Sequence, residues 1–245
     1  MFSKKRQSGD EVVVYYCDYI PNLAFSPLEA LELKKALGAM EIDKASNIGR
    51  CPAFKSFYEN TYAFLSPKNI KVWIDDNKTL NWLVEPSRID AHLHNLCIIR
   101  SEKTFSINNL MSIFWCEEEL VAEQIGTFSC GTELESKTQT YCGSFDISKW
   151  FRPMETAYLF LKNENSVSIK RGDPLYFVRF NTTKKVVLKQ FRMTPKLSEL
   201  FDTCVQFKSV DKSFHHKLSN YYDALFRRGY KKEITKAIKE SLVET

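Results

Sequence analysis

The sequence predicts a mainly β protein: a double-stranded β-helix or jelly-roll sandwich that carries an N-terminal helix and a C-terminal helical extension. Between about residues 61 and 194, short apolar or alternating runs follow one another and are separated by turn-forming residues. Their regular spacing favours an antiparallel sandwich or barrel over βαβ units. Helical periodicity is confined to a short stretch before this region and to the chain after it.

The N-terminal segment, residues 1–49, is predicted to hold a strand and a helix that pack on the core. The stretch 12–16 is rich in β-forming residues, which favours an early strand. Ser26 and Pro27 resemble an N-cap followed by proline at the first helical position. The leucines after them have roughly helical spacing, so we expect a helix over residues 26–38.

The central segment, residues 50–194, is predicted to form the β-sandwich domain. Its runs are apolar or alternate between apolar and polar residues, and Pro, Gly, Asn and Asp stand between them. The expected strands include residues 61–65, 70–74, 80–84, 93–99, 111–115, 156–161, 167–169, 175–180 and 186–191.

The triplet Arg171-Gly172-Asp173 lies between two of these runs. Gly172 accepts a positive φ, and Asp173 is biased to an extended conformation because Pro174 follows it. The triplet is therefore interpreted as the connection of a β-hairpin. An adhesive recognition motif would need an exposed loop on an extracellular protein, and no secretory signal is present.

The last segment, residues 195–245, is predicted to be a helical extension. A short helix opens it, and a longer amphipathic helix is expected over residues 214–226. Ile234, Ile238 and Leu242 then recur every four residues, which predicts a final helix.

Composition limits the classes of function. The 245 residues include 44% hydrophobic and 27% charged side chains, an ordinary globular balance. A net charge of +5 favours anionic partners but lacks the dense basic stripe of a dedicated nucleic-acid binder, so nucleic acid is not the expected partner. No apolar run reaches about 18 residues, so we expect a cytoplasmic protein without a membrane partner. The seven cysteines form no C-x-x-C pair and are interpreted as reduced, mostly buried thiols.

Three stretches of the central segment resemble one protein family. They are Arg50-Cys51-Pro52-Ala53-Phe54 leading to residues 62–67, then residues 145–153, and lastly residues 169–178. Over about residues 50–182 the chain is similar to an uncharacterised family of tailed bacteriophages and some bacteria, whose members look like double-stranded β-helix, cupin-like proteins. The resemblance implies this fold and a phage origin, and it implies no activity. The chain lacks the long Pro- and Gly-rich central loop of that family and has a C-terminal extension instead, so its function can differ.

A cupin-like fold raises the question of a metal site. Asp90, His92 and His94 alternate and would share one face of a strand, which suits iron, manganese or zinc. The pattern is incomplete, because the next carboxylate is Glu102 and no third histidine occurs in the second half of the barrel. In the alternative interpretation, the three polar side chains simply face solvent.

Two groups of basic residues are candidate binding sites. The candidate contacts for an anionic ligand at the mouth of the barrel are Arg152, Lys170, Arg171 and Arg179. The candidate partner surface, for phosphates or an acidic protein, is Arg227, Arg228, Lys231 and Lys232. The alternative for the second group is an amphipathic helix that packs on the β domain or on a second subunit.

The leading interpretation is a phage-type cytoplasmic binding protein with no cofactor and no evident catalytic site, which acts on a host factor during infection. The sequence contains no nucleophile elbow, P-loop or dinucleotide-binding fingerprint. Two alternatives stay open: a metal-dependent enzyme of the cupin or 2-oxoglutarate oxygenase type, and a protein that sequesters a nucleotide. Association into a homo-oligomer is also left open.

Overall fold

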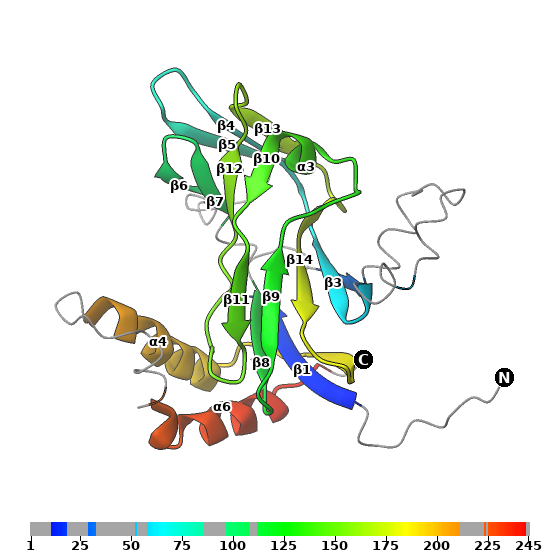
Figure 1. The fold of residues 1–245 in the computed structure, drawn as a ribbon. Coiled ribbons are helices and arrows are strands. Elements are labelled where there is room, and N and C mark those ends of the chain that lie inside the picture. Colours follow the sequence, from blue (N-terminus) through cyan, green and yellow to red (C-terminus); the bar gives the residue numbers. More distant parts are fainter. Residues whose placement is uncertain are drawn as a thin grey trace.

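The computed structural model describes residues 11–18, 29–32, 52, 58–85, 97–107, 112–210, 223 and 225–243. These residues form a mainly β structure, with helices α4 (Pro195–Val210) and α6 (Tyr230–Lys239) together at one end (Figure 1). The predicted fold class, a β-sandwich with C-terminal helices, is confirmed. The double-stranded β-helix connectivity and the domain boundaries stay predictions. No helix in the described ranges is both long and apolar enough to cross a membrane.

The strands of the described segments are arranged in four sheets. The first has the order β15 (Lys185–Gln190), β1 (Glu11–Asp18) and β8 (Ser112–Cys116), with β1 and β15 parallel. The second has the order β11 (Gly143–Asp146), β9 (Val121–Ile125), β14 (Pro174–Phe180), β3 (Thr61–Leu65) and β2 (Glu29–Glu32).

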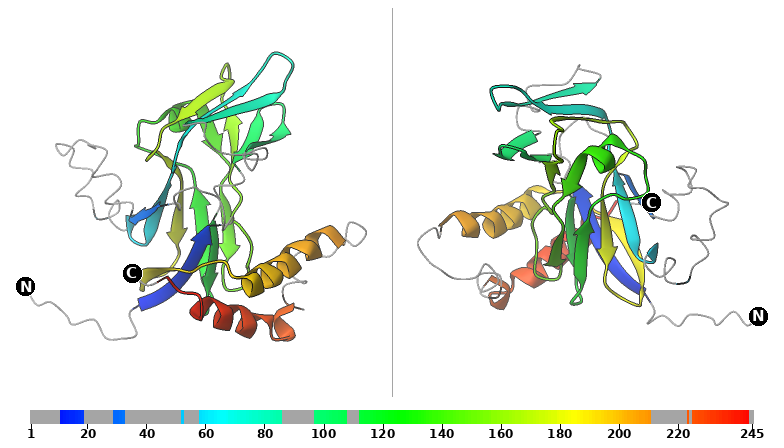
Figure 2. Two further views of the ribbon diagram at one scale, coloured as in Figure 1. Left: turned by 180° about the vertical axis from the view of Figure 1, so that it is seen from behind. Right: turned by 45° about the horizontal axis from the view of Figure 1, so that its top comes forward.

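The third sheet has the order β10 (Thr138–Thr140), β12 (Ala157–Phe160), β7 (Thr104–Ile107) and β6 (Cys97–Ser101). The fourth has the order β13 (Ser166–Ile169), β4 (Asn69–Ile74) and β5 (Leu80–Glu85). These two sheets and the short helix α3 (Glu133–Lys137) lie at the end of the molecule away from α4 and α6, as Figure 1 and Figure 2 both show.

The sheet that contains β1 and β8 is buried on both faces. Because successive side chains of a strand point to opposite faces, β8 contributes to two apolar clusters. Phe114 and Cys116 belong to the cluster between the sheets, whereas Ile113 and Trp115 belong to the cluster beneath the helices. Burial on both faces explains why the β8 sequence, SIFWC, is almost wholly apolar and does not alternate.

The cluster between the sheets contains the fully buried ring of Phe64. This ring stacks on Tyr176 with 5.3 Å between ring centroids and meets Phe114 edge-on, also at 5.3 Å. Such aromatic contacts stabilise beyond the apolar area they bury. They join β3 and β14 of the second sheet to β8 of the first.

Helices α4 and α6 close the second cluster. Ile234 and Ile238 are fully buried in it, together with Trp115 of β8, which confirms the final helix predicted from their spacing. Leu242 lies beyond the end of α6, where it forms an isolated bridge with Phe191 and is 36% exposed. The helix therefore ends before the last residue of the predicted repeat.

The helix predicted over residues 26–38 is wrong where the structure describes that segment. Residues 29–32 form the edge strand β2, which pairs antiparallel with β3. Pairing with β2 gives hydrogen-bond partners to the N–H and C=O groups at the open edge of β3. This stabilisation exceeds the modest helix preference of Glu-Ala-Leu-Glu. The rest of that segment, and most of the helix predicted over residues 214–226, lie outside the described residues.

The triplet Arg171-Gly172-Asp173 is a turn, as predicted, but it is not the loop of a hairpin. Strand β13 pairs with β4 in one sheet, whereas β14 pairs with β3 and β9 in another. The antiparallel pair of β4 and β13 thus continues into the antiparallel pair of β3 and β14. The chain changes direction between them at Ser66 and at Arg171–Asp173, and we call this place the corner. There the Ser66 N–H donates to the Asp173 carbonyl and the Gly172 N–H donates to the Ser66 carbonyl, both at 2.8 Å. Gly172 permits the corner because its φ is +89°.

Replacing Gly172 with alanine should lower the free energy of unfolding by about 1 kcal/mol, because a residue with a side chain is strained at this positive φ. No atom lies within 4 Å of the Cβ that alanine would add, so the loss comes from the backbone and not from a clash. Urea denaturation of both proteins measures the difference. Asn163→Gly, at a residue with φ +73°, is the control and should cause no loss. If Gly172→Ala were as stable as the native protein, the claim that a side chain strains the backbone at this position would be wrong.

Candidate anion-binding groove

The metal site suggested by the sequence lies outside the described residues. Asp90, His92 and His94 all fall there, as do the other histidines of the chain. Within the described ranges, no group of three His, Cys, Asp or Glu side chains could hold a metal ion. The metal hypothesis therefore stays a prediction.

The structure does not gather the residues proposed for an anion at the mouth of the barrel. Lys170 and Arg171 lie together at the corner before β14, but Arg179 is roughly 20 Å further along that strand. Arg179 lies 4.0 Å from the Glu123 carboxylate. Arg152 sits over the ring of Trp150, with 5.4 Å from its guanidinium carbon to the ring centroid. These four residues thus form no single site.

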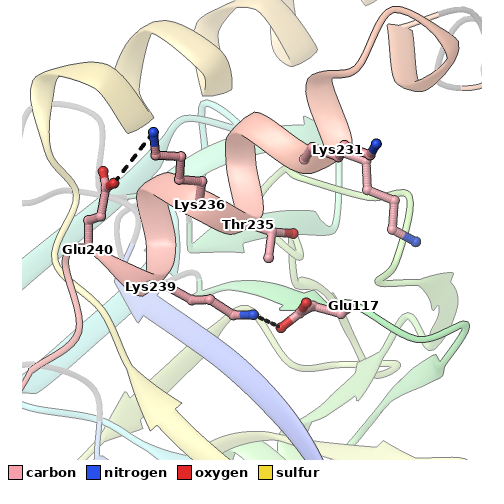
Figure 3. A pocket seen from close by; sticks show the side chains of 7 residues that line it. Glu117, Lys231, Thr235, Lys236, Lys239 and Glu240 are labelled. Carbon is pink, nitrogen blue, oxygen red and sulfur yellow. Dashed lines mark ion pairs between the residues drawn. The ribbon is translucent and has the colours of Figure 1, made fainter.

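The structure brings the residues of the proposed partner surface close to one another, but only two of them line a groove. Lys231 and Lys232 lie on the first turn of α6, and Arg227 and Arg228 are exposed just before it. The two lysines line an open groove of about 660 Å³. The other residues that line this groove are Glu117, Thr235, Lys236, Lys239 and Glu240, as Figure 3 shows. We call it the α6 groove.

The α6 groove has a fixed wall because α6 is anchored to the core. The apolar face of α6, with Ile234 and Ile238, is buried against β1 and β8, which directs the lysines outward. The indole N–H of Trp115 donates a 3.0 Å hydrogen bond to the Thr235 hydroxyl in the wall of the groove. Gly229, with φ +92°, lets the chain turn into the helix.

Glu117 holds one end of the groove together. Its carboxylate lies 2.7 Å from the Lys239 amine and accepts a 3.2 Å hydrogen bond from the Tyr15 hydroxyl. The hydrogen bond with Glu117 raises the pKa of Lys239. Burial, followed by the charge of Glu117, raises the pKa of Tyr15. Lys236 pairs more loosely with Glu240, at 3.9 Å (Figure 3).

The other end of the groove keeps an uncompensated positive charge. Among the residues that the structure describes, no carboxylate forms an ion pair with Arg227, Arg228, Lys231 or Lys232. From residue 227 to residue 240 the sequence has six basic and two acidic side chains. The start of α6 is thus a site that attracts anions.

Burial makes several of the described cysteines poor nucleophiles. Cys17, Cys97, Cys116 and Cys204 are buried, as the sequence predicted for most of the thiols. Burial raises the pKa of Cys204 to about 12, and it does the same for the half-buried Cys130. A thiol with so high a pKa contains little thiolate at neutral pH.

Sequence reasoning found the lysines of the groove but missed the role of Glu117. The run Glu117-Glu118-Glu119 is typical of a solvated loop, and Glu118 does pair with Lys184 at the surface. Glu117 instead contacts Lys239, a residue of the last helix. No sequence signal links residues so far apart in the chain.

Alkaline pH should lower the free energy of unfolding through the cluster of Tyr15, Glu117 and Lys239. In the folded protein the pKa values of Lys239 and Tyr15 lie above their ordinary values, so both groups keep protons that the unfolded chain loses first. Their contribution to stability is complete below about pH 10 and falls as the pH rises through the raised values. Urea denaturation between about pH 8 and pH 11 measures this fall.

The Glu117→Gln variant isolates the role of the carboxylate, because several other tyrosines also titrate at high pH. Glutamine keeps an oxygen for the Tyr15 hydroxyl but removes the charge beside Lys239. The stability of this variant should therefore fall less steeply with pH than that of the native protein. Identical pH profiles would contradict the ionic role of Glu117.

Comparison with protein-family models, with curated proteins and with solved structures gave no significant match.

Proposed function

We propose that this protein is a binding protein whose β-sandwich presents the α6 groove to an anionic partner. The observation that carries the proposal is the cluster of Arg227, Arg228, Lys231 and Lys232, whose charges are not compensated by the described residues. Surface charges of one sign raise the local concentration of opposite charges and accelerate association.

The attachment of α6 to the core supports this role. A site on a rigid element loses less conformational entropy on binding than a site on a mobile loop. Ile234 and Ile238 pack against Trp115, and the Trp115 indole binds Thr235 of the groove wall. The lysine side chains must still be ordered on binding, but the helix that carries them is already in place.

The resemblance to phage proteins extends the proposal to a biological setting. It supports a partner that is a host factor met in the cytoplasm of an infected cell. The three stretches that carry the resemblance lie in the central segment, and the groove lies on the C-terminal extension that the family lacks. The partner would therefore be particular to this chain and not common to the family.

A binding titration with poly-L-glutamate tests the proposal. The native protein should bind this polymer at low salt, and the affinity should fall steeply with added salt. The reason is that the screening length shrinks from about 10 Å at 0.1 M to about 3 Å at 1 M ionic strength. Poly-L-lysine of equal length is the control and should not bind. Failure to bind polyglutamate at low salt, or binding that salt does not change, would overturn the proposal.

A further inference from the structure

We infer that the α6 groove receives a phosphate monoester carried by a partner polypeptide, and that Lys231, Lys232 and Thr235 are its three donors. This inference rests on the proposed function and names the chemistry of the partner at the same site. Its starting point is Thr235, the hydroxyl in a groove whose other lining side chains are all charged. A hydroxyl adds a directed hydrogen bond to the attraction between charges.

The Thr235 hydroxyl is oriented by the core and keeps a proton to donate. The indole N–H of the buried Trp115 donates to the hydroxyl oxygen at 3.0 Å, so this oxygen is an acceptor and its own hydrogen is left over. Within the described part of the chain, Thr235 donates no side-chain hydrogen bond. A hydroxyl that accepts a hydrogen bond also becomes a better donor. Thr235 therefore offers an oriented donor to an oxygen atom in the groove.

Two amines lie beside this hydroxyl. Lys231 precedes Thr235 by four residues, which places the two side chains on the same side of α6. Figure 3 shows both on the side of the helix that faces Glu117. Lys232 lines the same groove. Neither lysine forms an ion pair with a carboxylate of the described residues, so both amines are available to a ligand.

The charge of the groove and its number of donors match a phosphate monoester. Four lysines and two glutamates line the groove, which leaves a net charge of +2. Each glutamate pairs with one of the two lysines further along α6, at 2.7 and 3.9 Å, so the excess charge is that of Lys231 and Lys232. A phosphate monoester carries a charge near −2 at neutral pH and has three acceptor oxygens. A carboxylate has one charge and two oxygens, so it leaves part of the site unused.

The open shape of the groove favours a phosphate on a polypeptide over a free small molecule. Sites for small molecules are concave and enclose most of the ligand. The α6 groove is open, and its lining residues include no aromatic ring on which a nucleobase could stack. A phosphorylated side chain that projects from a partner reaches such a groove without being enclosed. Acidic residues that flank it in the partner would be attracted to Arg227 and Arg228.

Calorimetric titration of the full chain with three probes tests the inference. The first probe is an acidic peptide with one phosphoserine. The second is the same peptide with two adjacent glutamates in place of the phosphoserine, which gives nearly the same charge. The third is phosphoserine alone, capped at both ends. The phosphopeptide should bind about tenfold more tightly than either of the other two.

Each other result has a distinct meaning. Equal or weaker binding of the phosphopeptide than of the diglutamate peptide would overturn the phosphate and leave the proposed function standing. Equal binding of capped phosphoserine and of the phosphopeptide would overturn the polypeptide source. Failure of all three probes, together with failure of polyglutamate, would overturn the proposed function as well.

Variants of Thr235 separate the donated hydrogen bond from the surrounding charge. Thr235→Val should weaken binding of the phosphopeptide about tenfold and remove its advantage over the diglutamate peptide. Thr235→Ser keeps the hydroxyl and should weaken binding less than threefold. Urea denaturation checks that each variant is folded at the temperature of the titration. Native affinity for the phosphopeptide in Thr235→Val would overturn the role of Thr235.

A lysine variant tests the site without disturbing the core. Lys231→Met should also weaken binding of the phosphopeptide about tenfold. Lys103→Met is the matched control, because Lys103 is exposed in the turn after β6, away from α6. The control removes the same charge and should weaken binding less than threefold. Equal losses from the two lysine variants would overturn the assignment of Lys231 as a donor.

Discussion

Replacing Trp115 with alanine should lower the free energy of unfolding by about 3–5 kcal/mol, the range for removing a large buried aromatic side chain. Trp115 is 0% exposed in the cluster beneath the helices. Its ring meets Phe151 edge-on at 5.7 Å and Phe226 at 5.9 Å between centroids. Its indole N–H also donates to Thr235, so the substitution loosens α6 as well as the core.

Two milder variants separate the contributions of Trp115. Trp115→Phe keeps an aromatic ring and should cost less than the alanine variant. Thr235→Val removes only the acceptor of the buried indole N–H and should cost about 1–3 kcal/mol. Urea denaturation followed by circular dichroism measures all three variants. A Trp115→Ala variant within about 1 kcal/mol of the native protein would contradict the packing described here.

Reversing two charges at the start of α6 should have the largest effect on binding. Lys231→Glu combined with Lys232→Glu should lower the affinity for polyglutamate about ten- to a hundredfold. Each lost surface pair is worth about 0.2–1 kcal/mol, and each reversal adds repulsion of similar size. Stability should change little, because neither lysine has an ion-pair partner among the described residues.

The matched control is Lys103→Glu combined with Lys162→Glu. Both lysines are exposed, in the turns that follow β6 and β12, at the end of the molecule away from α6 (Figure 1). This variant has the same change in net charge but leaves the groove intact. Its affinity for polyglutamate should fall less than threefold. Equal losses from the two double variants would show that net charge, and not the groove, governs binding.

The strands could be predicted where local pattern and burial agree. Residues 11–18, 61–65, 174–180 and 185–190 are strands in the structure and were expected to be strands, at least over most of their length. The short strands β10 and β11 were not predicted, because three or four residues carry too little pattern.

Long-range pairing could not be predicted from the sequence. The corner at Gly172 has the local chemistry of a hairpin turn, yet its two strands pair with other partners in different sheets. The parallel pairing of β1 with β15 joins strands from opposite ends of the chain. Local propensity contains no information on which strands pair, because the pairing partners are determined by tertiary contacts.

The candidate site could also be predicted only where it depends on local sequence pattern. The four-residue spacing predicted the final helix, in which Ile234 and Ile238 are buried, and the basic residues Lys231 and Lys232 were expected to belong to a partner surface. The network of Tyr15, Glu117 and Lys239 depends on how β1, β8 and α6 pack together, so it became visible only in the structure.

The location of a bound anionic peptide tests the central claim most directly. An oligoglutamate peptide of defined mass can be coupled to lysines in contact with it by a zero-length carbodiimide reagent, and mass mapping then identifies those lysines. The account predicts coupling at Lys231 and Lys232 first, with loss of coupling at high salt. Coupling spread evenly over the exposed lysines, or concentrated at Lys103 and Lys162, would contradict it.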